Sequence, residues 1–221
     1  MLRARRNIGR LDSSSLKSGL VHLWEFDGDA NDKIGETNLT PTGVSGTISY
    51  ATGKMKNCIF LNGGYFSNNA KTISLTDWTF AFWIRIINGG NQGISGIIGK
   101  STGTEYQGIR YVKTADNQYK IALNTDSSNS NSAIFTGNVW RHICINKNAN
   151  KTLFVDGQKV AFDNDMNYNI TINAPIYVGV DNYAFNRYAV CYLEQLAIWN
   201  RVLSDIEVAK LYNEGNGLIF E

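Results

Sequence analysis

The stretch NVWRHICINKNANKTLFVDGQKV, residues 138–160, carries the clearest fold signal in the chain. Its first half alternates side chains with a period of two, which predicts a strand with one face in the core. One face takes Val139, Arg141, Ile143 and Ile145, and the other takes Trp140, His142 and Cys144. The second half places Asp156-Gly157 between two apolar runs, the strongest short-range signal for a β-hairpin. The stretch therefore predicts antiparallel strands joined by tight turns.

Similar runs recur on both sides of this stretch. In TFAFWIRII, residues 79–87, four large apolar side chains alternate with Ala81, Trp83 and Arg85. Further apolar runs occupy residues 20–26, 57–62, 108–113, 119–124, 176–180 and 191–199. The connections are rich in Gly, Asn, Ser and Asp, which tolerate turn conformations. About ten to twelve short strands at this spacing predict a β-sandwich or a barrel.

One well-capped helix is expected near the end, in RVLSDIEVAKLYNEGNG, residues 201–217. Ser204 and Glu207 have the spacing of a capping box, and Gly215 is placed to stop the helix in a left-handed conformation. A helix of about ten residues does not persist alone in water. It must therefore pack on the strands.

Five pieces in this order resemble the LamG-like branch of the concanavalin A-like lectin/glucanase superfamily. They are LVHLWEFDGDANDKIG, GKMKNCIFLNGGYFSN, DWTFAFWIR followed by GIIGKS, the opening stretch, and CYLEQLAIWNRVLSDIEVAKLYNEG. The resemblance covers roughly residues 20–217. It implies an all-β fold, a two-sheet antiparallel jelly-roll sandwich over residues 20–221, with one short C-terminal helix. That helix would close one end of the sandwich with Ile206, Leu211 and Tyr212.

Residues 1–19 are expected to form an extended basic arm. They hold Arg3, Arg5, Arg6, Arg10 and Lys17 against Asp12 alone, a balance of +4. The segment lacks the apolar region of a secretory signal. Its arginines could neutralise phosphates, but no base-reading element follows, so no specific nucleic-acid binding is expected. We expect the arm to bind a partner surface, such as a neighbouring subunit, and its deletion to leave a folded sandwich.

The composition excludes several other classes. The net charge of +2 argues against a general affinity for polyanions. The sequence contains no run of 18 apolar residues, so no membrane span is predicted. Three cysteines without CxxC spacing predict neither a disulfide framework nor a zinc site. Each cysteine is expected in a strand as a small apolar side chain.

Catalysis is not expected. Glucanases that the chain resembles carry paired acids at alternate positions of one strand, and the nearest segment here, residues 193–196, holds one acid. His142 stands at a position that is structural in such proteins. GxSxG, HExxH and P-loop motifs are also missing from the sequence.

Calcium is the one cofactor that the sequence raises. The segment 27–32 holds Asp27, Asp29 and Asp32, and oxygen-rich turns suit this ion. In some members of the resembled family this end of the sandwich holds calcium, which would make Asp32 and Glu194 ligands, with Asp27 or Asp29 as the third. The alternative is a turn whose acids cap backbone N–H groups.

Sugar binding needs an exposed aromatic face beside planar hydrogen-bonding groups. A loop between two strands offers Tyr183, Phe185, Arg187 and Tyr188, and Tyr106 lies in a second candidate loop. The alternative is that these aromatic rings cover the rim of the sandwich, or that Arg187 contacts a protein.

Together these observations predict a non-enzymatic structural or adhesive subunit of a larger assembly. In its compact ending, the chain resembles LamG-like modules of phage virion proteins and bacterial surface proteins. The expected protein is a virion component made in the bacterial cytoplasm, a capsid decoration or a fibre-associated subunit, or else a protein of the bacterial cell surface. It would attach through its arm and contact host or surface glycans. A carbohydrate-binding lectin is the second hypothesis, and a glycan-cleaving enzyme is the third.

Overall fold

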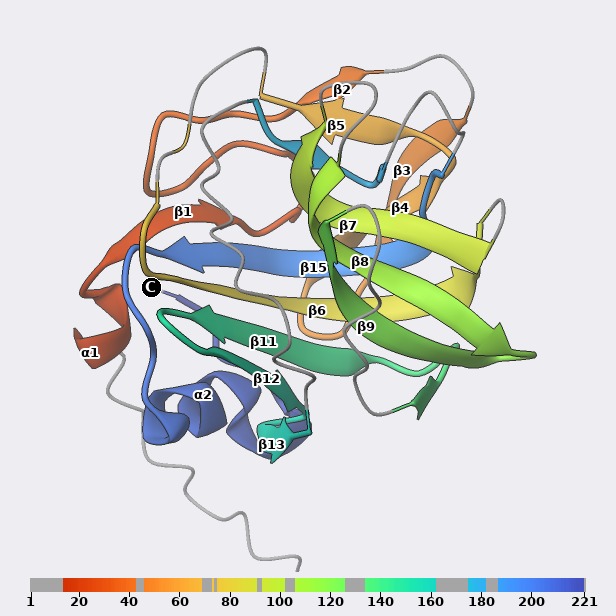
Figure 1. The fold of residues 1–221 in the computed structure, drawn as a ribbon. Helices are drawn as coiled ribbons and strands as arrows, with labels where there is room; N and C mark the ends of the chain where they lie inside the picture. Colours follow the sequence, from red (N-terminus) through yellow and green to blue (C-terminus); the bar gives the residue numbers. More distant parts are fainter. Residues whose placement is uncertain are drawn as a thin grey trace, which may run out of the picture.

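Two antiparallel sheets form the body of the computed structural model (Figure 1). It describes residues 14–42, 46–68, 73, 75–90, 93–101, 106–125, 134–161, 175–181 and 187–220, without the side chains of residues 100, 101, 106, 107, 124 and 125. Arg3, Arg5, Arg6 and Arg10 of the expected arm lie outside these residues. The all-β, two-sheet fold is confirmed.

Sheet A contains the long central strands. In spatial order its strands are β13 (Gln158–Val160), β12 (Lys151–Val155), β11 (Arg141–Lys147), β6 (Trp78–Asn88), β15 (Val190–Trp199), β4 (Asn57–Asn62) and β3 (Thr47–Thr52). A further strand, β1 (Leu20–Trp24), pairs with β15. The expected hairpin joins β12 to β13, and Asp156 and Gly157 both have the positive φ that a tight hairpin turn requires.

Sheet B lies over one face of sheet A. Its order is β10 (Phe135–Thr136), β9 (Gln118–Thr125), β8 (Tyr106–Ala115), β7 (Ile94–Ser101), β14 (Tyr177–Val178), β5 (Tyr65–Ser67) and β2 (Thr40–Thr42). Alternate residues of both sheets meet in the main core, which includes Phe82 of β6, Ile143 of β11 and Ile109 of β8. The period of two therefore gave the correct inward face for the central strands.

A second core covers the outer face of sheet A, the face turned away from sheet B. Side chains from β6, β11, β12 and β15 point outward here and are buried: Ala81, Cys144, Phe154, Ala197 and Trp199. They are covered by α1 (Ser14–Lys17), by α2 (Asp205–Tyr212) and by the segment that ends at Phe220. Sheet A is consequently buried on both faces over this half, and α2 runs below β11 and β12 in Figure 1.

Helix α2 has the predicted capping box. The Ser204 hydroxyl accepts from the Glu207 N–H, and the Glu207 side chain accepts from the Ser204 N–H. The left-handed residue that ends the helix is Asn213, two positions before the expected Gly215, which also has a positive φ. The expectation that this helix closes one end of the sandwich is wrong, because α2 packs on the outer face of sheet A. Of the three residues expected in that contact, Leu211 is buried there and Tyr212 stacks on Trp83, whereas Ile206 is 71% exposed.

The root of the arm is packed on the sandwich. Leu16 of α1 is fully buried, and its carbonyl accepts a 2.7 Å hydrogen bond from Trp199 Nε1. Arg201 donates to the carbonyls of Ser15 and Ser18. Residues 14–19 are therefore continuous with the packed structure. Within the described part of the chain, no helix has both the length and the apolar character needed to cross a membrane.

Candidate functional site

The acidic turn after β1 is organised by one carboxylate. Asp32 Oδ1 accepts from the N–H groups of Leu23, Ile34 and Gly35, and Oδ2 lies 2.6 Å from His22 Nδ1. Burial would raise the pKa of Asp32, but these hydrogen bonds outweigh burial and hold it below its usual value. Asp32 thus acts as the internal cap of this turn.

Glu194 plays the same part in another turn. From the outer face of β15 its carboxylate accepts from the backbone N–H groups of Lys54, Met55 and Lys56. The residue is 1% exposed. Because its partners precede it by 138 to 140 positions, this role has no local sequence signal.

The other two calcium candidates have different partners. Asp27 accepts from the Asn57 side chain, and Asp29 forms an exposed ion pair with Lys33 at 2.9 Å. Among the residues that the structure describes, no three His, Cys, Asp or Glu side chains form a group that could hold a metal ion. Calcium binding stays a prediction, and the contacts of Asp32 and Glu194 are those of the capping alternative.

His142 is a buried side chain of β11. It is 3% exposed, and its ring packs on Trp83 and Tyr212. Burial lowers its pKa to about 4, so the ring is neutral at physiological pH. These contacts fit the structural role expected for this histidine.

The predicted sugar-binding loop is closed at its base by residues that the structure describes. The Asp181 N–H donates to the Arg187 carbonyl, and Val180 forms a bridge with Tyr188. Tyr188 stacks on Tyr65 of β5, with ring centroids 5.9 Å apart and planes at 14°. Tyr183 and Phe185 lie outside the described residues, and Tyr106 begins β8 with its side chain not described.

Three tyrosines therefore gather on the outer face of sheet B. Tyr65 also packs on Tyr177 of β14 at 6.0 Å, and all three rings are half-buried. Their chain neighbours Phe66, Val178 and Ala189 point into the main core, which places the tyrosines on the opposite side. We call Tyr65, Tyr177 and Tyr188 the tyrosine cluster.

A charged group lies beside the tyrosine cluster. The buried Asp181 carboxylate has Arg110 of β8 on one side and Arg187 on the other, each with Nη1 at 3.6 Å from Oδ2. Burial raises the pKa of Asp181, and the two guanidinium groups oppose that shift. The site thus combines aromatic rings with planar donors and acceptors, the chemistry expected for sugar binding.

Sequence reasoning found Arg187 and Tyr188, in a loop that begins at Asp181, but missed Arg110, Tyr65 and Tyr177. Arg110 lies in the middle of a strand, and the sequence around a charged strand residue does not indicate whether its side chain is buried. Tyr65 and Tyr177 each precede a core residue, so alternation in their short strands was the only available signal.

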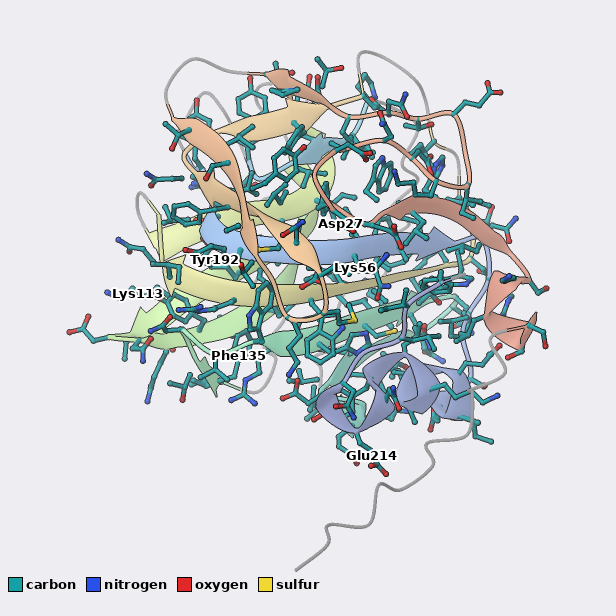
Figure 2. The ribbon with its side chains drawn as sticks, turned by 180° about the vertical axis from the view of Figure 1, so that it is seen from behind. Asp27, Lys56, Lys113, Phe135, Tyr192 and Glu214 are labelled. Carbon is teal, nitrogen blue, oxygen red and sulfur yellow. The ribbon has the colours of Figure 1, made fainter. Side chains whose placement is uncertain are left out.

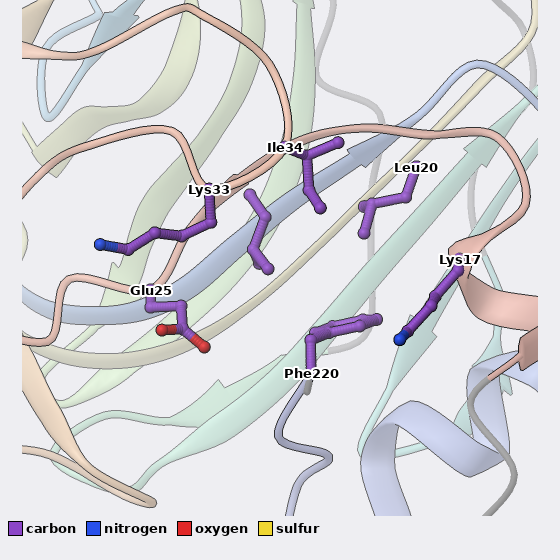
Figure 3. A pocket seen from close by; sticks show the side chains of 7 residues that line it. Lys17, Leu20, Glu25, Lys33, Ile34 and Phe220 are labelled. Atoms are coloured by element: carbon purple, nitrogen blue, oxygen red, sulfur yellow. The ribbon is translucent and has the colours of Figure 1, made fainter.

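A separate pocket of about 360 Å³ lies between α1, β1 and the end of the described chain (Figure 3). Its wall is apolar, formed by Leu20, Leu23, Ile34 and Phe220. Glu25 and Lys33 stand at one side and Lys17 at the other (Figure 3). It lies on the sheet A side of the sandwich, away from the tyrosine cluster.

Residues 61–209 match the family model described as the concanavalin A-like lectin/glucanases superfamily. The chain belongs to this superfamily. No curated protein sequence matches the chain.

Solved structures share this superfamily fold at low sequence identity. Domain 4 of AbnA, a GH43 extracellular arabinanase from Geobacillus stearothermophilus, in complex with arabinotriose, is 18% identical with a TM-score of 0.68, over 86% of this chain and 96% of that one. The binding domain of Paraclostridial Mosquitocidal Protein 1 is 23% identical with a TM-score of 0.63, over 90% and 53%. Trypanosoma rangeli sialidase is 14% identical with a TM-score of 0.64, and the chain spans 33% of that enzyme.

Proposed function

We propose that this chain is a non-enzymatic carbohydrate-binding module whose binding surface is the tyrosine cluster with Arg187, which the buried Asp181 holds in place. The observation that carries the proposal is the convergence of three half-buried tyrosines and a buried Arg–Asp–Arg group on one face. The superfamily, and the AbnA domain in complex with arabinotriose, support a glycan as the ligand.

The chemistry of the surface fits binding without cleavage. Aromatic rings pack against the C–H faces of sugars, while a guanidinium group such as that of Arg187 donates to their hydroxyls. The buried Asp181 carboxylate would hold Arg187 in place. Most glycoside hydrolases use two carboxyl groups about 5 to 9.5 Å apart. Among the described residues of this surface, Asp181 is the one carboxylate, and two arginines hold it.

Glycan binding by alanine variants tests the proposal. We expect the intact chain to bind members of a glycan array, and Tyr188→Ala combined with Arg187→Ala to weaken that binding at least tenfold. Tyr50→Ala is the matched control, because Tyr50 is 44% exposed on β3 of the other sheet. The proposal fails if no glycan binds the intact chain. It also fails if the double variant binds glycans as tightly as the intact chain and the Tyr50→Ala control do.

A second proposal concerns the assembly. We propose that the module is an adhesive subunit of a phage virion, a capsid decoration or fibre-associated protein, or of a bacterial surface, attached through residues 1–13. The supporting observation is that α1 anchors the root of this segment on the outer face of sheet A, opposite the tyrosine cluster. Attachment and glycan contact would then use opposite faces.

Truncation tests the attachment. A chain that begins at Ser14 keeps α1 and should fold, but should no longer co-sediment with density-purified particles of the source culture. The full chain should appear in such particles by peptide mass spectrometry at many copies. Absence from the particles, or unchanged sedimentation of the truncated chain, would remove this proposal and leave the glycan proposal intact.

A further inference from the structure

The half of sheet A that the helices leave uncovered carries an aromatic row. On the outer face, Tyr192 of β15 pairs in register with Phe60 of β4 and with Arg85 of β6. Trp140, just before β11, packs on Tyr192 at 6.4 Å. All four side chains are half-buried. The open face of an antiparallel sheet is normally polar, so this row calls for an explanation.

The side chains of the row pack against one another. Because β15 lies between β4 and β6, the Tyr192 ring stands between Phe60, at 4.5 Å and 24°, and the Arg85 guanidinium, at 5.3 Å from the ring centroid. Arg85 Nε and Nη2 both donate to Asn138 Oδ1, at 2.9 and 2.7 Å. The aromatic row is therefore rigid before any partner arrives, which reduces the entropy lost on binding.

This packing argues against a sugar as the ligand. Sugars stack on open ring faces, whereas Tyr192 has Phe60 and Arg85 against its two faces. Tyr, Trp and Arg are the residues that dominate binding energy at protein–protein interfaces. Figure 2 shows Tyr192 on the face that is turned away from sheet B.

The positive charge of this face indicates what kind of partner it would bind. Arg85 has an amide and a ring as its contacts, and the Lys54 ammonium lies over Trp83, two residues before Arg85 on β6, at 5.5 Å. Within the described residues, neither cation has a carboxylate within 4 Å. Other cations of the fold do: Lys33, Arg141 and Arg201 pair with Asp29, Asp156 and Glu207. The one carboxylate described beside them on this face, Glu194, is 1% exposed and accepts from the backbone N–H groups of Lys54, Met55 and Lys56. The aromatic row thus offers positive charge and apolar area, with this carboxylate buried beneath the surface.

We infer that the aromatic row, with Lys54, is a docking surface for a protein segment that carries carboxylates beside an aromatic or aliphatic side chain. The carboxylates would meet Arg85 and Lys54, and the apolar side chain would cover Phe60 and Trp140. This surface lies on the opposite sheet from the tyrosine cluster. A subunit could therefore hold such a partner and a glycan at the same time.

Synthetic peptides test the inference directly. The probe is a fluorescein-labelled peptide in which aspartate alternates with phenylalanine. Its controls are the same peptide with asparagine for aspartate and with alanine for phenylalanine. We expect the first peptide to bind at least tenfold more tightly than either control, equivalent to about 1.4 kcal/mol. Equal binding of the asparagine peptide, or displacement of the first peptide by dextran sulfate as readily as by unlabelled peptide, would overturn the inference.

Variants locate the binding. Arg85→Glu should reduce affinity at least tenfold, and Arg85→Gln, which keeps a side chain able to reach Asn138, should also reduce it. Lys159→Glu makes the same charge reversal on β13 of the same sheet and should have no effect. In NMR spectra of the full chain, the Trp140 indole N–H signal should move on peptide addition. The Trp24 indole, buried and bonded to the Thr37 carbonyl, should not. Unchanged affinity in both Arg85 variants, or an unmoved Trp140 signal, would contradict the proposed surface.

Discussion

At the scale of single residues, buried carboxylates determine how the turns of this protein are built. Asp32 and Glu194 each accept several backbone N–H groups that no strand would otherwise satisfy. An unsatisfied buried donor costs about 1–3 kcal/mol, so each carboxylate supports a whole turn. Both had been candidates for calcium, and the same oxygen-rich chemistry serves either use.

Asp32→Ala should destabilise the protein by about 3 kcal/mol, because it orphans the N–H groups of Leu23, Ile34 and Gly35. Urea denaturation would measure the loss. Asp29→Ala is the matched control in the same turn, since it removes an exposed ion pair with Lys33 worth less than about 1 kcal/mol. Equal losses in the two variants would contradict the capping role.

At the scale of elements, the strands that the sequence predicted correctly are those with one face buried in the core. Strands with one face in the core, such as β4 and β6, were predicted nearly to the residue because their alternation is a direct result of that burial. The edge strand β3 was missed because its residues are mostly exposed and no apolar alternation marks it. The role of α1 was also missed, since its contacts are with residues more than 180 positions away.

An ion pair joins α2 to the root of the arm. Arg201 bonds the Glu207 carboxylate and two carbonyls near α1, and the hydrogen bond from Arg201 lowers the pKa of Glu207 to about 2. A lowered carboxyl pKa adds stability above the unfolded-state pKa, and that stability is lost as pH falls toward 2. We expect Glu207→Gln to remove about 1 kcal/mol at neutral pH and almost nothing near pH 2. Denaturation at several pH values checks this, with Asp205→Asn as the control.

Helix α1 should contribute to stability far beyond its four residues. Leu16→Ala opens a cavity in the second core and should cost about 3 kcal/mol. Ile206→Ala, at a position 71% exposed, should change stability by less than about 0.5 kcal/mol. Thermal melts of both variants would be compared with the chain truncated before Ser14. A melt of Leu16→Ala that matches the intact chain would show that α1 is not part of the cooperative fold.

At the scale of the whole molecule, sheet A is the middle layer of a three-layer arrangement. The main core lies between the sheets, and the second core lies beneath α1, α2 and the final segment. Sequence alternation predicted the first core, since it has strict period two. The second core could not be predicted, because small side chains such as Ala81 and Ala197 mark it. The tyrosine cluster was partly missed for a different reason. Its three rings come from three separate segments of the chain, and only the fold brings them together.

The three cysteines can report on the two cores separately. All are buried thiols, Cys144 in the second core and Cys191 in the main core, and burial raises the pKa of Cys58 to about 11. Native labelling should therefore be slow. If the outer layer opens by itself, Cys144 should react before Cys191 in mass spectra of labelled peptides taken over time. Equal rates at both would mean that the two cores open together.

The position of Leu16 and Phe220 in one core has a consequence for protein engineering. Both ends of the described chain lie on the sheet A side, close enough for Lys17 and Phe220 to line one pocket (Figure 3). A polypeptide that continued from either end would leave from the same side. The module could therefore be grafted into a surface loop of an unrelated host, or its ends joined by a short linker and new ends opened elsewhere, with sheet B still facing outward.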